Sequence, residues 1–67
     1  MSAKVVKGQL WHQFVSPGVM RHVRVLSDPD ENGMVEVAIW VPGREDLRKT
    51  QPCHTASFVG LRLVEES

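Results

Sequence analysis

The sequence has no tyrosine and only one cysteine, Cys53. A single thiol cannot form a disulfide within the chain, and no cluster of cysteine and histidine shows the spacing of a zinc site. An unpaired thiol is typical of a reducing compartment. Residues 1–7 lack the apolar run of a signal peptide, and no stretch approaches the roughly 18 apolar residues of a membrane span. The sequence therefore predicts a soluble, cytoplasmic protein with no membrane partner and no metal or other cofactor.

The chain also has no net charge, because its 8 basic residues balance its 8 acidic residues. The charges are unevenly distributed: residues 1–27 carry bases and no acid, whereas residues 28–46 are mainly acidic. Solvated strand faces and acidic turns explain this distribution. The alternative is a basic strip that meets an acidic partner or phosphate.

A regular alternation is present in residues 34–41. Every second side chain there is β-branched, which is typical of a strand that is buried on one side. The apolar side consists of Val35, Val37, Ile39 and Val41. Residues 23–27 precede this strand across a loop of turn-forming residues, 28–33. We therefore expect a hairpin that contributes its valine side to the core.

Turn signals divide the rest of the chain into short strands. Pro17 and Gly18 fit the two central positions of a type II turn. The fourth strand is expected to end before Pro52, and Thr55 to cap one helical or 3₁₀ turn that places Phe58 in the core. The expected strands are residues 9–15, 20–27, 34–41, 47–51 and 61–64. Residues 1–7 and 65–67 are expected to be tails around one domain, residues 8–64.

Five short strands with one helical or 3₁₀ turn before the last strand predict an all-β fold, a small five-stranded SH3-like barrel. The layout is Gly8-x-x-Trp11 … Val23-x-Val25 … Val35-x-Val37 … Phe58-Val59-x-Leu61-Arg62-Leu63-Val64. This layout resembles the short SH3-like barrel proteins of phages and other bacterial mobile elements. The resemblance spans residues 8–64, and it implies a fold and a mobile-element context without implying an activity.

Residues that could carry chemistry do not form a recognisable catalytic pattern. Cys53 and His54 are adjacent, so on an extended backbone their side chains point to opposite sides. His12 and His22 could face each other across the first hairpin, which would give two metal ligands without a third. We therefore predict no catalytic, cofactor-binding or metal-binding residue and no small-molecule substrate. Enzymatic activity would require an active site shared at the centre of an oligomer.

The residues most suited to binding are aromatic and basic. If the valine side of residues 34–41 is the core, Trp40 points outward on the same side as Met34, unless a loop or the N-terminal tail covers it. Trp11 has the same two interpretations, with burial favoured. Met34, Trp40 and Trp11 are the candidate interface residues, because tryptophan is enriched in interface hot spots.

A chain of 67 residues buries a small core and commonly depends on a partner for stability. The sequence therefore predicts a non-enzymatic binding module that contacts another protein or itself as a homo-oligomer. The alternative is a nucleic-acid-binding protein, in which arginines and lysines gather beside an aromatic ring. The candidate contacts for that alternative are Arg21, Arg24, Arg48 and Lys49.

Overall fold

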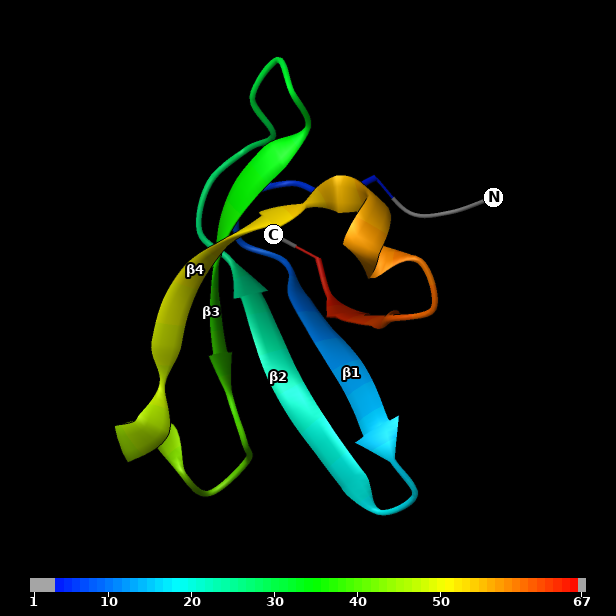
Figure 1. Ribbon diagram of the computed structural model, residues 1–67, viewed down its shortest axis with the longest axis vertical. Helices are drawn as coiled ribbons and strands as arrows, with labels where there is room; N and C mark the ends of the chain where they lie inside the picture. The colour runs from blue at the N-terminus through cyan, green and yellow to red at the C-terminus, as the bar shows by residue number, and fades with distance from the viewer. Residues whose placement is uncertain (1–3, 67) are drawn as a thin grey trace.

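Five antiparallel strands form a single sheet in the computed structural model, which describes residues 4–66 (Figure 1). The strands are β1 (Leu10–Ser16), β2 (Val19–Val25), β3 (Met34–Trp40), β4 (Lys49–His54) and β5 (Arg62–Glu65). Two 3₁₀ helices, η1 (Glu45–Leu47) and η2 (Thr55–Phe58), precede β4 and β5. The predicted all-β fold and the turn before the last strand are confirmed. Closure of the sheet into a barrel stays a prediction, and the expectations for residues 1–3 and 67 lie outside the described residues.

The strand order is β4-β3-β2-β1-β5, so β4 and β5 are the two edges of the sheet. The turn between β1 and β2 is Pro17-Gly18, and Gly18 has the positive φ, 79°, that the third position of a type II turn requires. In Figure 1 this turn and the connection between β3 and β4 both lie at the lower end, whereas the loop between β2 and β3 lies at the upper end.

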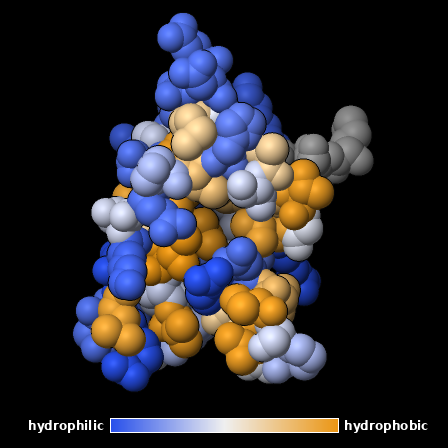
Figure 2. Space-filling model, in the orientation of Figure 1, coloured by the Kyte–Doolittle hydropathy of each residue, from blue (hydrophilic) through white to orange (hydrophobic). Residues whose placement is uncertain are grey.

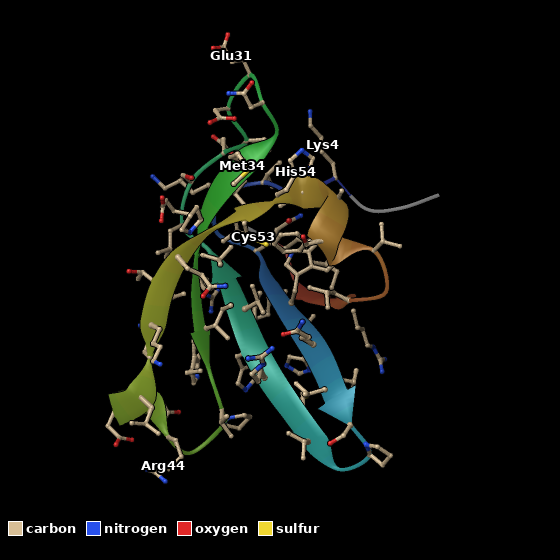
Figure 3. All side chains as sticks on the ribbon, in the orientation of Figure 1. Lys4, Glu31, Met34, Arg44, Cys53 and His54 are labelled. Atoms are coloured by element: carbon tan, nitrogen blue, oxygen red, sulfur yellow. The ribbon has the colours of Figure 1, made fainter. Side chains whose placement is uncertain are left out.

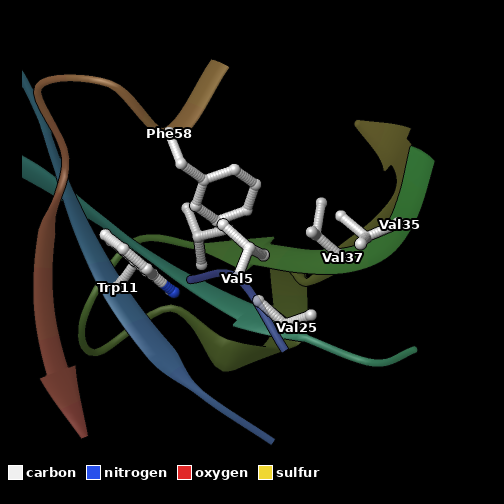
Figure 4. Close-up of a cluster of buried hydrophobic side chains, with 7 residues drawn as sticks. Val5, Trp11, Val25, Val35, Val37 and Phe58 are labelled. Atoms are coloured by element: carbon white, nitrogen blue, oxygen red, sulfur yellow. The ribbon is translucent and has the colours of Figure 1, made fainter. Parts of the chain in front are cut away.

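The core lies on one face of the sheet, where the alternation in β2 and β3 predicts it. Val23 and Val25 from β2 and Val37 from β3 are buried, and Val37 has no exposed surface. Phe58 of η2 covers this face and contacts Trp11 edge to face, with ring centroids 5.2 Å apart (Figure 4). The predicted burial of Phe58 is confirmed. Val41 was expected on the core face, but it is exposed because β3 ends one residue earlier.

The N-terminal segment contributes to the core before residue 8. Val5 is buried against the sheet, although residues 1–7 were expected to be a tail. Gln9 holds this segment in place: its Oε1 accepts hydrogen bonds from the backbone of Val6 and from the indole of Trp11, and its Nε2 donates to the carbonyl of Lys4. One buried amide therefore connects the segment to the core.

β4 begins later than predicted and continues through Pro52 to His54, which corrects the expectation that this strand ends before Pro52. The backbone of Glu36, opposite Pro52, uses its N–H and C=O on the β2 side, with Ser27 and Leu26. Glu36 and Pro52 are thus a pair without mutual hydrogen bonds, and the nitrogen of Pro52 faces outward at the sheet edge. Proline is tolerated there because no ladder donor is lost.

The loop of residues 28–33 is fixed by Asp30. Its Oδ1 accepts hydrogen bonds from the backbone N–H groups of Asn32 and Met34, at 2.8 and 2.9 Å. These bonds stabilise the carboxylate and lower the pKa of Asp30 below its usual value. The carbonyl of Gly33 then accepts from the backbone N–H of Thr55, so the loop is joined to the start of η2.

The ends of η2 and β5 also differ from the expected boundaries. His54, and not Thr55, is the N-cap of η2: its Nδ1 accepts a hydrogen bond of 3.0 Å from the backbone N–H of Ala56. Glu65 was assigned to a C-terminal tail, but it belongs to β5 and pairs with Leu10. β5 pairs with β1, so the last strand of the chain forms the edge of the sheet beside β1.

Candidate functional site

A row of aromatic and basic side chains crosses the outer face of the sheet, opposite the core. His12 on β1 lies between Arg62 on β5 and His22 on β2, and His22 lies opposite Trp40 on β3. Arg48, immediately before β4, places its guanidinium carbon 4.2 Å from the centroid of the Trp40 ring. We name this row the cross-sheet stripe: Arg62, His12, His22, Trp40 and Arg48.

The three rings of the cross-sheet stripe contact one another. The centroids of His12 and His22 are 4.6 Å apart in an edge-to-face arrangement, and His22 stacks on Trp40 at 5.3 Å. All three rings are half-buried, whereas the two arginines at the ends of the row are exposed. Aromatic faces therefore form the middle of the stripe, and positive charge forms both ends.

His12 is the electrostatically perturbed member of the stripe. Partial burial, the neighbouring His22 and the charge of Arg62 all lower the pKa of His12. Each of these influences disfavours the imidazolium form. His12 Nε2 and His22 Nδ1 are buried and have no hydrogen-bond partner among the described residues. At neutral pH the His12 ring is consequently an uncharged, mainly apolar surface between two basic ends.

The predicted nucleic-acid contacts are not all brought together. Arg24 and Arg48 lie on the outer side, but Arg24 is occupied by the carbonyl of Gly8 and by a salt bridge to Glu65. Arg21 pairs with Gln13 and Lys49 pairs with Ile39, which places both on the opposite face. His12, His22 and Arg62 were missing from that set, although the expected meeting of the two histidines is confirmed.

The predicted interface residues are also dispersed. Trp11 is buried in the core, as favoured, and therefore presents no contact surface. Met34 and Trp40 share the outer face but lie at opposite ends of β3, about 20 Å apart at 3.3 Å per residue. Figure 3 shows Met34 beside the upper loop. Trp40 is on the outer face but only half-exposed, because the Arg48 guanidinium lies over its ring.

Exposed apolar side chains gather at the ends of the two hairpins. We name them the hairpin-end patch: Phe14, Val15 and Val19 beside the β1–β2 turn, and Val41 and Leu47 in the β3–β4 connection. Phe14 is 61% exposed, and Val15 and Leu47 are each 53% exposed. In Figure 2 apolar surface appears at both lower corners of the molecule, whereas the upper loop is hydrophilic.

Two further features accompany these surfaces. An open hollow of about 650 Å³ lies beside η2, lined mainly by apolar side chains that include Trp11, Phe58 and Val59. Cys53 is half-buried, packs against the core and donates its thiol to the carbonyl of His54 at 3.6 Å. Across residues 4–66 no group of three or more histidine, cysteine or acidic side chains is placed to hold a metal ion.

Comparison of the chain with family models, with curated proteins and with solved structures found no match. Within the part of the chain that the structure describes, no helix has the length and apolar character needed to cross a membrane. Two surfaces are therefore the candidates for function: the cross-sheet stripe and the hairpin-end patch.

Proposed function

We propose that this chain is a non-enzymatic binding module that makes protein contacts, chiefly with a second copy of itself, through the hairpin-end patch. The observation that carries the proposal is the exposure of five large apolar side chains at one end of a very small domain. Exposed apolar side chains that group together mark interaction sites, because water solvates them poorly, and here one group lies at each hairpin end.

The size of the core supports the same proposal. The buried hydrophobic cluster consists mainly of valines, with one tryptophan and one phenylalanine. A domain of this length gains little stability from its own core, and association commonly supplies the remainder. A standard interface covers about 800 Å² on each partner, which is about one sixth of the 4661 Å² that this chain exposes.

The two hairpin ends suit contact between identical copies. Beyond the pair His22–Trp40, β2 has no partner on β3, so the ends of the hairpins diverge and each presents its own apolar side chains. A two-fold dimer brings the same surface of both copies together. One copy's β1–β2 end can then pack against the other copy's β3–β4 end, and both apolar areas are covered at once.

Sedimentation of the wild type and two variants over a range of concentrations tests this proposal. The wild type should pass from monomer to dimer as the concentration rises through the micromolar range, whereas V15S/L47S should remain monomeric. The control is V59S, because Val59 is 81% exposed but lies after η2, away from the hairpin ends. A wild type that stays monomeric, or equal weakening by V59S, contradicts the proposal.

A further inference from the structure

We propose that the cross-sheet stripe is a binding site for single-stranded nucleic acid. The proposal goes beyond self-association, because it assigns a second ligand to the strip of rings and arginines that crosses the outer face of the sheet. It also differs from a basic strip made of Arg21, Arg24, Arg48 and Lys49, since the structure places Arg21 and Lys49 on the opposite face.

The first argument is the order of residue types along the stripe. Both exposed ends are arginines, Arg62 and Arg48, and the positions between them are the rings of His12, His22 and Trp40. Single-strand binding combines phosphate neutralisation with base stacking on aromatic rings. A row with cations at its ends and rings in its middle provides both within one surface.

The second argument is length. The stripe crosses all strands of the sheet from β5 to the start of β4, which is four inter-strand spacings of about 4.8 Å, or about 19 Å. Phosphates in one stacked strand are about 3.4 Å apart along its axis. About five or six nucleotides therefore span the distance between the two arginines, within the site sizes of small single-strand-binding domains.

The third argument is the surroundings of the stripe on the same face. The flanking positions are Leu10, Arg24 and Ala38 on one side and Phe14 and Met20 on the other, and none is acidic. Phe14 is largely exposed and lies two residues from His12, so an open aromatic ring adjoins the stripe. The acids of this face, Glu36 and Glu65, lie toward its other end, and Glu65 is paired with Arg24. The strand positions beside the row therefore bring no acidic side chain next to its rings. The acids of η1, Glu45 and Asp46, precede Arg48, and Asp46 pairs with Arg44.

Only unpaired bases can stack on the rings of the cross-sheet stripe. Rings that lie along a sheet can stack only with bases that are splayed from a helix, whereas a duplex keeps its bases inside. Both faces of Trp40 are already in contact, one with His22 and one with Arg48. An incoming base would displace the Arg48 guanidinium from the indole, and the freed guanidinium would then contact phosphate.

Fluorescence anisotropy of a labelled oligothymidine of 12 nucleotides, measured at several salt concentrations, tests the proposal. Each phosphate contact to a single strand contributes about 0.7 to the slope of log K against log salt. R48Q/R62Q should reduce the slope by about 1.4 and weaken binding at low salt. The matched control is R44Q/K49Q, which removes the same charge from residues outside the stripe and should leave the slope unchanged.

Two further measurements separate stacking from simple charge attraction. An abasic oligomer with the same number of phosphates should bind about tenfold more weakly, because it has no bases to stack. A duplex competitor should displace the oligomer poorly. Circular dichroism shows whether each variant is folded. If loss of the Arg48–Trp40 contact unfolds R48Q/R62Q, the salt dependence is measured with R62Q alone. Undetectable binding at low salt, equal effects of both double variants, or equal binding of the abasic oligomer overturns the proposal.

Discussion

Gln9 shows how much of this small fold depends on one polar side chain. Its amide connects the backbone of Lys4 and Val6 to the indole of Trp11, and its own carbonyl accepts a hydrogen bond from the backbone N–H of Val25. Most buried polar groups in proteins make hydrogen bonds, because an unpaired one costs free energy. Nothing in the sequence distinguishes Gln9 from Gln13 and Gln51, because most partners of Gln9 are backbone atoms that only the folded chain assembles.

The lowered pKa of a single residue, His12, leads to a prediction about how stability depends on pH. A histidine whose pKa falls on folding binds protons more readily in the unfolded state, so the folded state loses stability as pH falls below the unfolded pKa of about 6.5. Its closest charged neighbours, Arg62 on β5 and His22 on β2, act in the same direction. Thermal unfolding at pH 7.5 and 5.5 should show a lower melting temperature in acid, and H12Q should show a smaller decrease. An equal decrease in H12Q contradicts this assignment.

At the scale of elements, the β3 alternation predicts the core face correctly for Val35 and Val37, but the two-residue turn by itself does not predict the register between β1 and β2. A two-residue turn that pairs Ser16 with Val19 would, without interruption, pair His12 with Val23. The pairing instead shifts at Val15, between Phe14 and Ser16, and His12 meets His22. A shift of one residue moves a side chain to the other face, so this irregularity determines the cross-sheet stripe.

The loop of residues 28–33 and η2 depend on each other through Gly33. Its φ of +78° is unfavourable for any residue with a side chain, and an added Cβ would lie 3.1 Å from Nε2 of His54. The other nitrogen of that ring caps η2, so a displaced ring also loses the cap. The cost of G33A should therefore exceed that of strain alone by about 1 kcal/mol.

Gly18 provides the matched control, because its φ is +79° and an added Cβ would meet no atom within 4 Å. G18A should show the strain by itself, about 1 kcal/mol. Urea unfolding of both variants measures the difference. Equal destabilisation by G33A and G18A would show that the close approach of Gly33 and His54 does not contribute to the free energy of unfolding.

At the scale of the whole molecule, stability should depend on very few large side chains. A chain of this length has a free energy of unfolding on the order of 3–10 kcal/mol, and replacing a buried phenylalanine by alanine costs about 3–5 kcal/mol. F58A should thus unfold at much lower urea or be unfolded without it. F14A makes the same change at an exposed position and should shift the stability of the monomer by less than about 0.5 kcal/mol. Similar effects of the two variants would contradict the position of Phe58 in the core.

The candidate surfaces were only partly predictable because they depend on the arrangement of the whole sheet. Phe58 and the valines follow from local alternation and turn chemistry, which short segments encode. The cross-sheet stripe takes its residues from β1, β2, β3, β5 and the residue before β4, so its composition depends on strand order and register together. The hairpin-end patch depends on where β3 ends, since Val41 would otherwise have joined the core face.

Pro52 also limits how far the sheet can extend from one molecule to the next. An added strand needs alternating donors and acceptors along the edge it joins, and the middle of β4 offers a carbonyl without an N–H. Continuous fibres require every molecule to be joined on both edges. Because Pro52 interrupts the β4 edge, we expect any backbone pairing between the β5 edges of two molecules to stop at a pair and not to continue as a fibre.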